Sequence, residues 1–222
     1  MARGPIIHRF LDPGDALGEV LFGIIMSLTF TVGARFFLAK GEFDRNDLIV
    51  GALGCNIAWG VIDAVLFVLG AVFFRSQRAH FYRALRAAPD DKAALATVED
   101  QFGLEDEPLN IPPEDRARLY QAIVTIGRRA TPARIRVTKD DLVAAFLVFA
   151  LVTFTAIPLI IPMIMIRDES VAVRVANSVQ IVLLFLGGWR WGSYTDLAPW
   201  KVGVAVTALG VGMSLMNVLL GG

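Results

Sequence analysis

The chain has 222 residues, of which 55% are hydrophobic and only 19% are charged, and its mean hydropathy is +0.59. This composition is too apolar for an ordinary soluble domain and indicates a membrane protein. Basic and acidic residues balance at 21 each, so net charge gives no reason to expect a nucleic-acid partner. Cys55 is the only cysteine, which excludes an internal disulfide and a zinc site built from cysteines.

Five apolar runs are long enough to cross a bilayer as helices, which takes about 20 residues each. They are residues 17–39, 48–74, 140–166, 171–189 and 200–220. We therefore predict an all-α integral membrane protein with five transmembrane helices. The fourth run is the least apolar, so four spans remain the alternative.

A polar insert separates the second run from the third. Residues 75–88 predict a basic helix that continues the second span, and residues 91–102 predict another helix that ends at Gly103. A third helix is expected over residues 114–130. The predicted organisation is residues 1–74 with an N-terminal segment and two spans, residues 75–138 as a three-helix insert, and residues 139–222 with three spans.

The distribution of basic residues predicts the orientation of the chain. Twelve of the 21 Lys and Arg lie between Arg75 and Lys139. Because cytoplasmic loops carry the excess of Lys and Arg, we expect the N-terminus and the insert in the cytoplasm and the C-terminus outside. The membrane expected is a prokaryotic inner membrane.

The first run carries three residues that share one helical face. At 100° per residue, Asp15, Glu19 and Met26 fall at about 0°, 40° and 20°. Carboxylate oxygens followed by a sulfur suit iron or manganese better than calcium, so these residues are candidate metal ligands. Asp15 also fits the first turn of a helix, where acids are favoured, and Met26 also fits ordinary packing.

The second run contains Asp63, the most deeply placed ionisable residue of the predicted spans. Charged groups in a span are costly, by about 2.5–3.5 kcal/mol on insertion scales, which makes Asp63 a candidate for a proton or cation path. Asn56 lies seven residues earlier on the same face. The alternative is a buried hydrogen bond between helices. Cys55 is either a small buried side chain or a thiol ligand.

Other candidates lie in the insert and the third span. The densest acidic cluster could gather cations before transport, although a solvated turn is the alternative; it comprises Glu99, Asp100, Glu105, Asp106 and Glu107. Pro158 and Pro162 each remove a backbone hydrogen bond and predict a helix kink.

Four stretches of the chain resemble the vacuolar iron transporter family. They are LFGIIMSLTFTVGA in the first span, LIVGALGCNIAWG in the second, TAIPLIIPMIM in the third and ALGVGMSLMNVLLGG in the fifth. The resemblance, to a divergent prokaryotic member, implies a homodimer with its pore between the two first spans and a metal-binding insert. It also implies export of ferrous iron or manganese from the cytosol, usually against protons.

The function expected is therefore transport of Fe²⁺ or Mn²⁺ out of the cytosol, with Glu19, Met26, Asn56 and Asp63 on the path. No enzymatic activity and no permanently bound cofactor are expected, and the partners expected are membrane lipid, a second copy of the chain and the metal ion. The insert contains no methionine, and Met26–Ser27 stand where the family has aspartate and glycine. These differences support two alternatives: a membrane scaffold or regulatory protein without transport, and a proton or monovalent-cation channel.

Overall fold

The computed structural model describes residues 10–39, 44–103, 111–131 and 134–220, and all regular structure in them is helical. The eight helices are α1 (Pro13–Ala39), α2 (Arg45–Ala87), α3 (Asp91–Phe102), α4 (Pro113–Arg129), α5 (Lys139–Phe154), α6 (Ile157–Met165), α7 (Glu169–Gly192) and α8 (Pro199–Leu219). Five segments of the described residues are long and apolar enough to cross a membrane, with α5 and α6 counted together as one.

The chain divides into two compact units. One contains residues 1–68 and 139–222, and the other contains residues 69–138. α2 is uninterrupted, so its apolar run and the basic stretch that follows belong to a single helix. The boundary at residue 69 therefore lies inside a helix.

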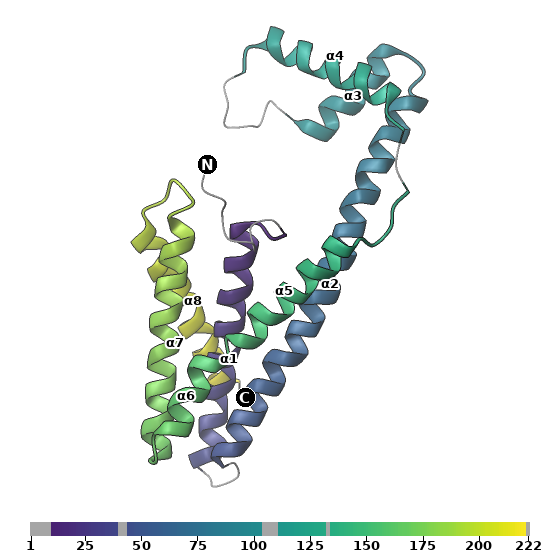
Figure 1. Cartoon of the computed structure of the whole chain (residues 1–222). Helices are drawn as coiled ribbons and strands as arrows, with labels where there is room; N and C mark the ends of the chain where they lie inside the picture. Colours follow the sequence, from purple (N-terminus) through teal and green to yellow (C-terminus); the bar gives the residue numbers. More distant parts are fainter. Residues whose placement is uncertain (1–9, 40–43, 104–110, 132–133, 221–222) are drawn as a thin grey trace, which may run out of the picture. The chain divides into compact units, whose positions relative to one another are not determined.

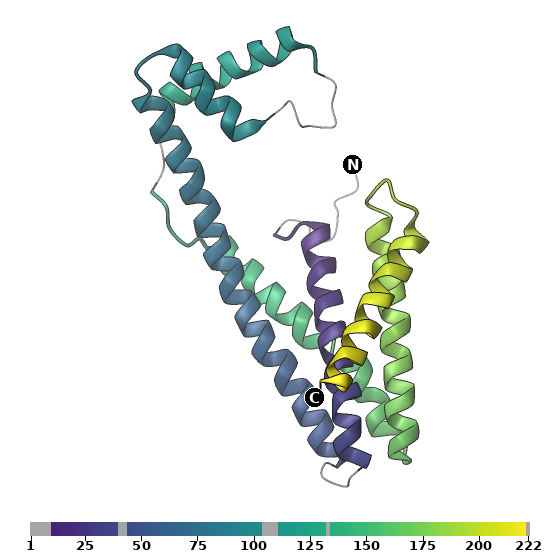
Figure 2. The ribbon, with the colours of Figure 1, turned by 180° about the vertical axis from the view of Figure 1, so that it is seen from behind.

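In the first unit, α7 and α8 lie side by side, as both views show (Figures 1 and 2). Glycines permit this close packing: a Cβ atom added at Gly188 would come within 2.9 Å of the Gly203 Cα, and one added at Gly192 within 2.8 Å of the Pro199 Cα. Small residues let helices in membranes approach closely enough for extensive van der Waals contact. α1 packs against both α7 and α8 through a buried cluster that includes Leu21.

The third apolar segment is two helices rather than one. α5 ends at Phe154 and α6 begins at Ile157, immediately before Pro158. Proline has no N–H to donate to the preceding turn, and its ring disfavours helical backbone before it. The helix continues through Pro162, which lies inside α6. The interruption therefore lies next to one of the two prolines proposed as kink residues.

The second unit has its own small core. Leu85 from the end of α2, Val98 from α3, and Tyr120 and Val124 from α4 are among its buried residues. α3 covers the predicted residues and ends at Gly103, whose positive φ of 49° is the left-handed conformation that glycine adopts readily.

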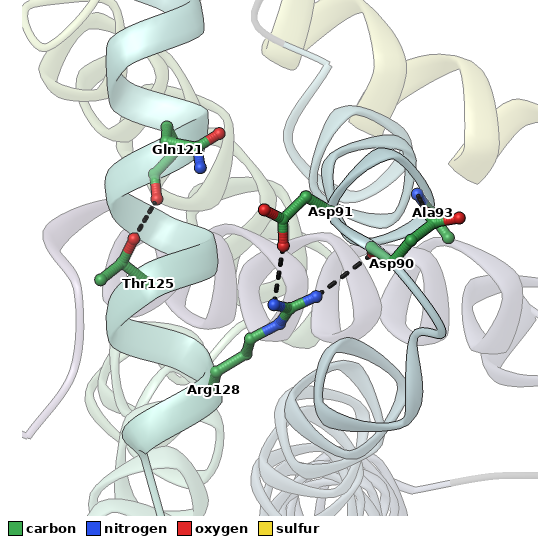
Figure 3. A network of polar contacts seen from close by, with 6 residues as sticks. All are labelled: Asp90, Asp91, Ala93, Gln121, Thr125 and Arg128. Atoms are coloured by element: carbon green, nitrogen blue, oxygen red, sulfur yellow. Dashed lines mark hydrogen bonds and ion pairs between the residues drawn. The ribbon is translucent and has the colours of Figure 1, made fainter.

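An arginine of α4 connects that helix with the capped start of α3 (Figure 3). The carboxylate of Asp90 accepts a hydrogen bond of 2.7 Å from the Ala93 N–H, which caps α3. Arg128 of α4 pairs with Asp91 over 2.7 Å and donates a second hydrogen bond to the Asp90 carbonyl oxygen. In α4 itself, the Thr125 hydroxyl donates to the Gln121 carbonyl oxygen.

Candidate functional site

α1 and the first part of α2 run antiparallel and meet through ring contacts. The rings of Phe22 and Trp59 pack edge to face with centroids 5.7 Å apart. Further along, the Phe30 ring covers Gly51 so closely that an added Cβ would overlap it. Both pairs have the same antiparallel register, and this register places Glu19 of α1 at the level of Asp63 of α2, to within one residue.

The carboxyl groups of Glu19 and Asp63 are within electrostatic reach of each other, and Asp15 adds a second, weaker repulsion on Glu19. Both Glu19 and Asp63 are half-buried, whereas Asp15 is exposed. The buried Oδ2 atom of Asp63 has no hydrogen-bond partner among the residues described. Two carboxyl groups that repel each other in a partly apolar setting favour binding of a proton or cation, which reduces their repulsion.

Asp15 does not cap α1. The carboxylate of Asp12 accepts a 2.9 Å hydrogen bond from the Gly14 N–H, and its carbonyl oxygen accepts the first backbone bond of the helix, from Ala16. Asp15 follows in the first turn, where its charge still complements the helix dipole. The sequence reasoning did not single out Asp12, although an aspartate before Pro-Gly is a recognisable start signal.

A buried amide connects three helices deeper in the first unit. Asn56 of α2 is fully buried, and its Nδ2 donates to the Val152 carbonyl oxygen and the Thr155 hydroxyl, each over 3.0 Å. A longer bond of 3.4 Å reaches the Gly23 carbonyl oxygen of α1. Asn56 therefore contacts α1 and the end of α5 at the same point.

The break between α5 and α6 explains why Val152 needs this donor. In a continuous helix its carbonyl oxygen would accept from the residue-156 N–H, but the Ala156 N–H donates to Thr153 instead. The Thr155 hydroxyl and Asn56 both donate to the freed carbonyl oxygen. Unsatisfied backbone groups are costly in lipid, so this amide stabilises the broken helix.

The polar contacts continue from α1 to α7. Ser27 donates to the Gly23 carbonyl oxygen and accepts a 2.6 Å hydrogen bond from the Nε2 of Gln180. One turn along, Thr31 and Asn177 are joined over 2.9 Å. A chain of hydrogen bonds thus runs from Gln180 through Ser27 and Gly23 to the amide of α2, and it links α7, α1, α2 and α5.

Two amide oxygens of this network are left with no donor. The Oδ1 of Asn56 and the Oε1 of Gln180 are buried and have no hydrogen-bond partner in the described part of the chain. Buried acceptors of this kind ordinarily bind water or an ion. The network therefore keeps two acceptor oxygens unused within the described part of the chain.

Met26 and Cys55 stand beside this network without joining it. Each immediately precedes a network residue, Ser27 and Asn56 respectively, so each points about 100° away from that residue around its helix. Both side chains are half-buried, and the Cys55 thiol is free.

The proposed metal ligands do not gather into one cluster in the residues described. No group of three His, Cys, Asp or Glu side chains there is arranged to hold a metal ion. Glu99 and Asp100 are exposed on α3. Glu105, Asp106 and Glu107 lie outside the described residues.

Ser27, Thr31 and Gln180 were missed by the sequence reasoning. The sequence does indicate a polar helical face here, because Ser27 and Thr31 are spaced by four within an apolar run. Gln180 is a long polar side chain in the middle of another apolar run, the pattern expected of a hydrogen bond between membrane helices.

The fold and these contacts define an all-helical protein with several helices apolar enough to cross a membrane. No model of a known protein family matches the chain, and no curated protein matches its sequence.

Proposed function

We propose that the protein transports a divalent metal ion, iron or manganese, out of the cytosol, with protons as the coupling ion. The observation that carries the proposal is the approach of Glu19 and Asp63 from two apolar helices. Ionisable side chains in membrane helices are rare and mark ion paths, proton relays or helix pairs. Two carboxyl groups that repel each other exchange protons for a cation with little change in net charge.

The amide network offers a continuation of this path. Asn56 lies two helical turns from Asp63 on the same face of α2, and its free Oδ1 atom adds an oxygen ligand. Oxygen donors suit Mn²⁺ and Fe²⁺, which complete their coordination with water. Glu19 and Asp63 would then receive the ion, and Asn56 would accept it deeper in the membrane.

The proposal includes a homodimer in a prokaryotic inner membrane, with five spans and a cytoplasmic insert. Support comes from α2, whose apolar side chains Val61, Val65 and Leu66 are all more than half exposed in the single chain. A second subunit or lipid must cover them. The positive-inside rule supports the orientation.

A proton or monovalent-cation channel is the second candidate function. It is favoured because no three-ligand group of His, Cys, Asp or Glu is present in the described part of the chain. A carboxyl pair and amide oxygens are sufficient for a proton or a monovalent ion.

Flux through proteoliposomes separates the two candidates. Purified protein is reconstituted with an interior metal-sensitive dye, and Mn²⁺ or Fe²⁺ is added outside under a pH gradient. Metal entry that alkalinises the lumen in step supports exchange of the metal ion for protons. Proton or potassium flux that is independent of both metals supports the channel, and the absence of all of these fluxes contradicts both.

A further inference from the structure

The second unit contains a basic cavity that no part of the proposed transport path uses. Its volume is about 310 Å³, and it lies between the part of α2 just after the apolar run and the segment that follows α4. Three arginines line it, Arg75 and Arg78 from α2 and Arg134 from the later segment, together with Tyr82 and Thr131. No acidic side chain is among its lining residues.

Two of the three arginines of this cavity, Arg78 and Arg134, have no charged partner in the described part of the chain. Arg78 and Arg134 are exposed and form no hydrogen bond or ion pair with any residue that the structure describes. Other arginines of the same unit do find partners: Arg128 pairs with Asp91, and Arg118 with Asp115. Guanidinium groups without a carboxylate, beside a hydroxyl donor, are suited to bind a phosphate.

An apolar surface adjoins the cavity on the same helix. Leu69, Phe73 and Phe74 are exposed by 57–65% and end immediately before Arg75. They belong to α2, whose most apolar window has a mean hydropathy of 2.3. The arginines therefore begin where the apolar surface of α2 ends. If that surface faces lipid, the arginines lie at the depth of the phospholipid headgroups.

We propose that this cavity binds the phosphate of an anionic phospholipid, whose acyl chains lie against Leu69 and Phe73. Arg78 and Arg134 hold the phosphate from two separate segments, and Tyr82 supplies a hydroxyl donor. Because the two arginines come from opposite ends of the insert, the lipid fastens the exit of α2 to the chain that leads into α5. This proposal needs α2 to cross a membrane, but it does not depend on which ion is transported.

Native mass spectrometry of the full-length protein tests the assignment, with phosphatidylglycerol titrated against phosphatidylcholine. The test variant is the double substitution Arg78→Gln and Arg134→Gln. The matched control is Arg86→Gln with Arg129→Gln, which removes the same charge from exposed positions of the same unit. Circular dichroism and the thermal midpoint without added lipid establish that both variants are folded.

We expect wild-type protein to retain phosphatidylglycerol in preference to phosphatidylcholine. The test variant should bind phosphatidylglycerol about thirtyfold more weakly, since each arginine near the headgroups contributes about fivefold, whereas the control should change by about twofold or less. Equal losses in both variants would show diffuse surface attraction and overturn the site. Competition by millimolar inorganic phosphate would assign the cavity to free phosphate and overturn the lipid. If the double variant does not fold, Arg134→Gln alone, which lies outside any helix, carries the same test with about a fivefold loss expected.

Discussion

The Nδ2 of Asn56 lies 3.0 Å from the carbonyl oxygen of Val152, which the break between α5 and α6 leaves without its helical donor. A side chain of one apolar helix thus replaces a backbone hydrogen bond that another helix has lost. The arrangement accounts for an asparagine in the middle of an apolar run, and its consequences can be measured.

Replacing Asn56 by alanine should destabilise the protein by about 1–3 kcal/mol, because a buried carbonyl oxygen loses a donor. Asn56→Asp should destabilise it more, since the aspartate oxygens would face acceptor atoms. Reversible unfolding in mixed detergent micelles measures both effects. Asn46→Ala, at an exposed position in the first turn of the same helix, serves as the control and should change stability little. Equal effects at positions 56 and 46 would contradict the structural role of the amide.

The contact between α1 and the break requires glycine at position 23. An added Cβ would overlap the Thr155 hydroxyl and lie 3.0 Å from the Val152 carbonyl oxygen. Gly23→Ala should therefore cost about 1–3 kcal/mol through overpacking. Gly54→Ala is the matched control, because an added Cβ there meets nothing within 4 Å, and it should be neutral or slightly stabilising. A neutral Gly23→Ala variant would show that the three helices do not meet as described.

The packing of α7 on α8 gives a separate prediction. Gly203→Ala should destabilise the protein by about 1–3 kcal/mol, because the new methyl would lie 2.9 Å from the Phe185 carbonyl oxygen. Gly212→Ala, on the same helix, introduces a methyl into open space. Thermal unfolding in detergent should separate the two variants by several degrees. A loss at position 212 as large as that at 203 would contradict close packing at Gly203 as the cause of the destabilisation.

In the insert, the cap of α3 should matter more than the ion pair beside it. Asp90→Ala removes a side-chain acceptor from the helix start and should cost about 1 kcal/mol. Arg128→Ala breaks an exposed pair and should cost less than about 1 kcal/mol. Hydrogen exchange of the full-length protein would detect the first effect as faster exchange of the Ala93 amide. Asp90→Asn, which keeps an acceptor oxygen, should restore protection; if it does not, the charge rather than the cap is responsible.

Local rules account for much of the helical structure. Apolar runs of about 20 residues specify helices in lipid, and the left-handed glycine at 103 ends α3 where the sequence predicts it. Side-chain partners between helices were not predictable, because they depend on rotation and crossing geometry that one sequence does not contain. The pairing of Ser27 with Gln180 is an example, since 153 positions separate them along the chain.

The proximity of Glu19 to Asp63 could not be predicted from the sequence either. Helical periodicity placed Asp63 and Asn56 on one face of α2, and it placed Glu19 near Met26 on α1. It gave no information about which faces of the two helices meet. The antiparallel contact of Phe22 with Trp59 supplies that information and places Glu19 by Asp63 rather than by Cys55.

The most direct test of the transport proposal is the rate of Mn²⁺ entry into proteoliposomes for Glu19→Gln, Asp63→Asn and the double variant. Each single variant should lose at least about tenfold in rate, and the double variant should lose little more, because residues that act as a unit are not additive. Glu114→Gln, an exposed carboxylate of the insert, should transport at the wild-type rate. Undiminished Mn²⁺ entry in the double variant would contradict the role of the carboxyl pair.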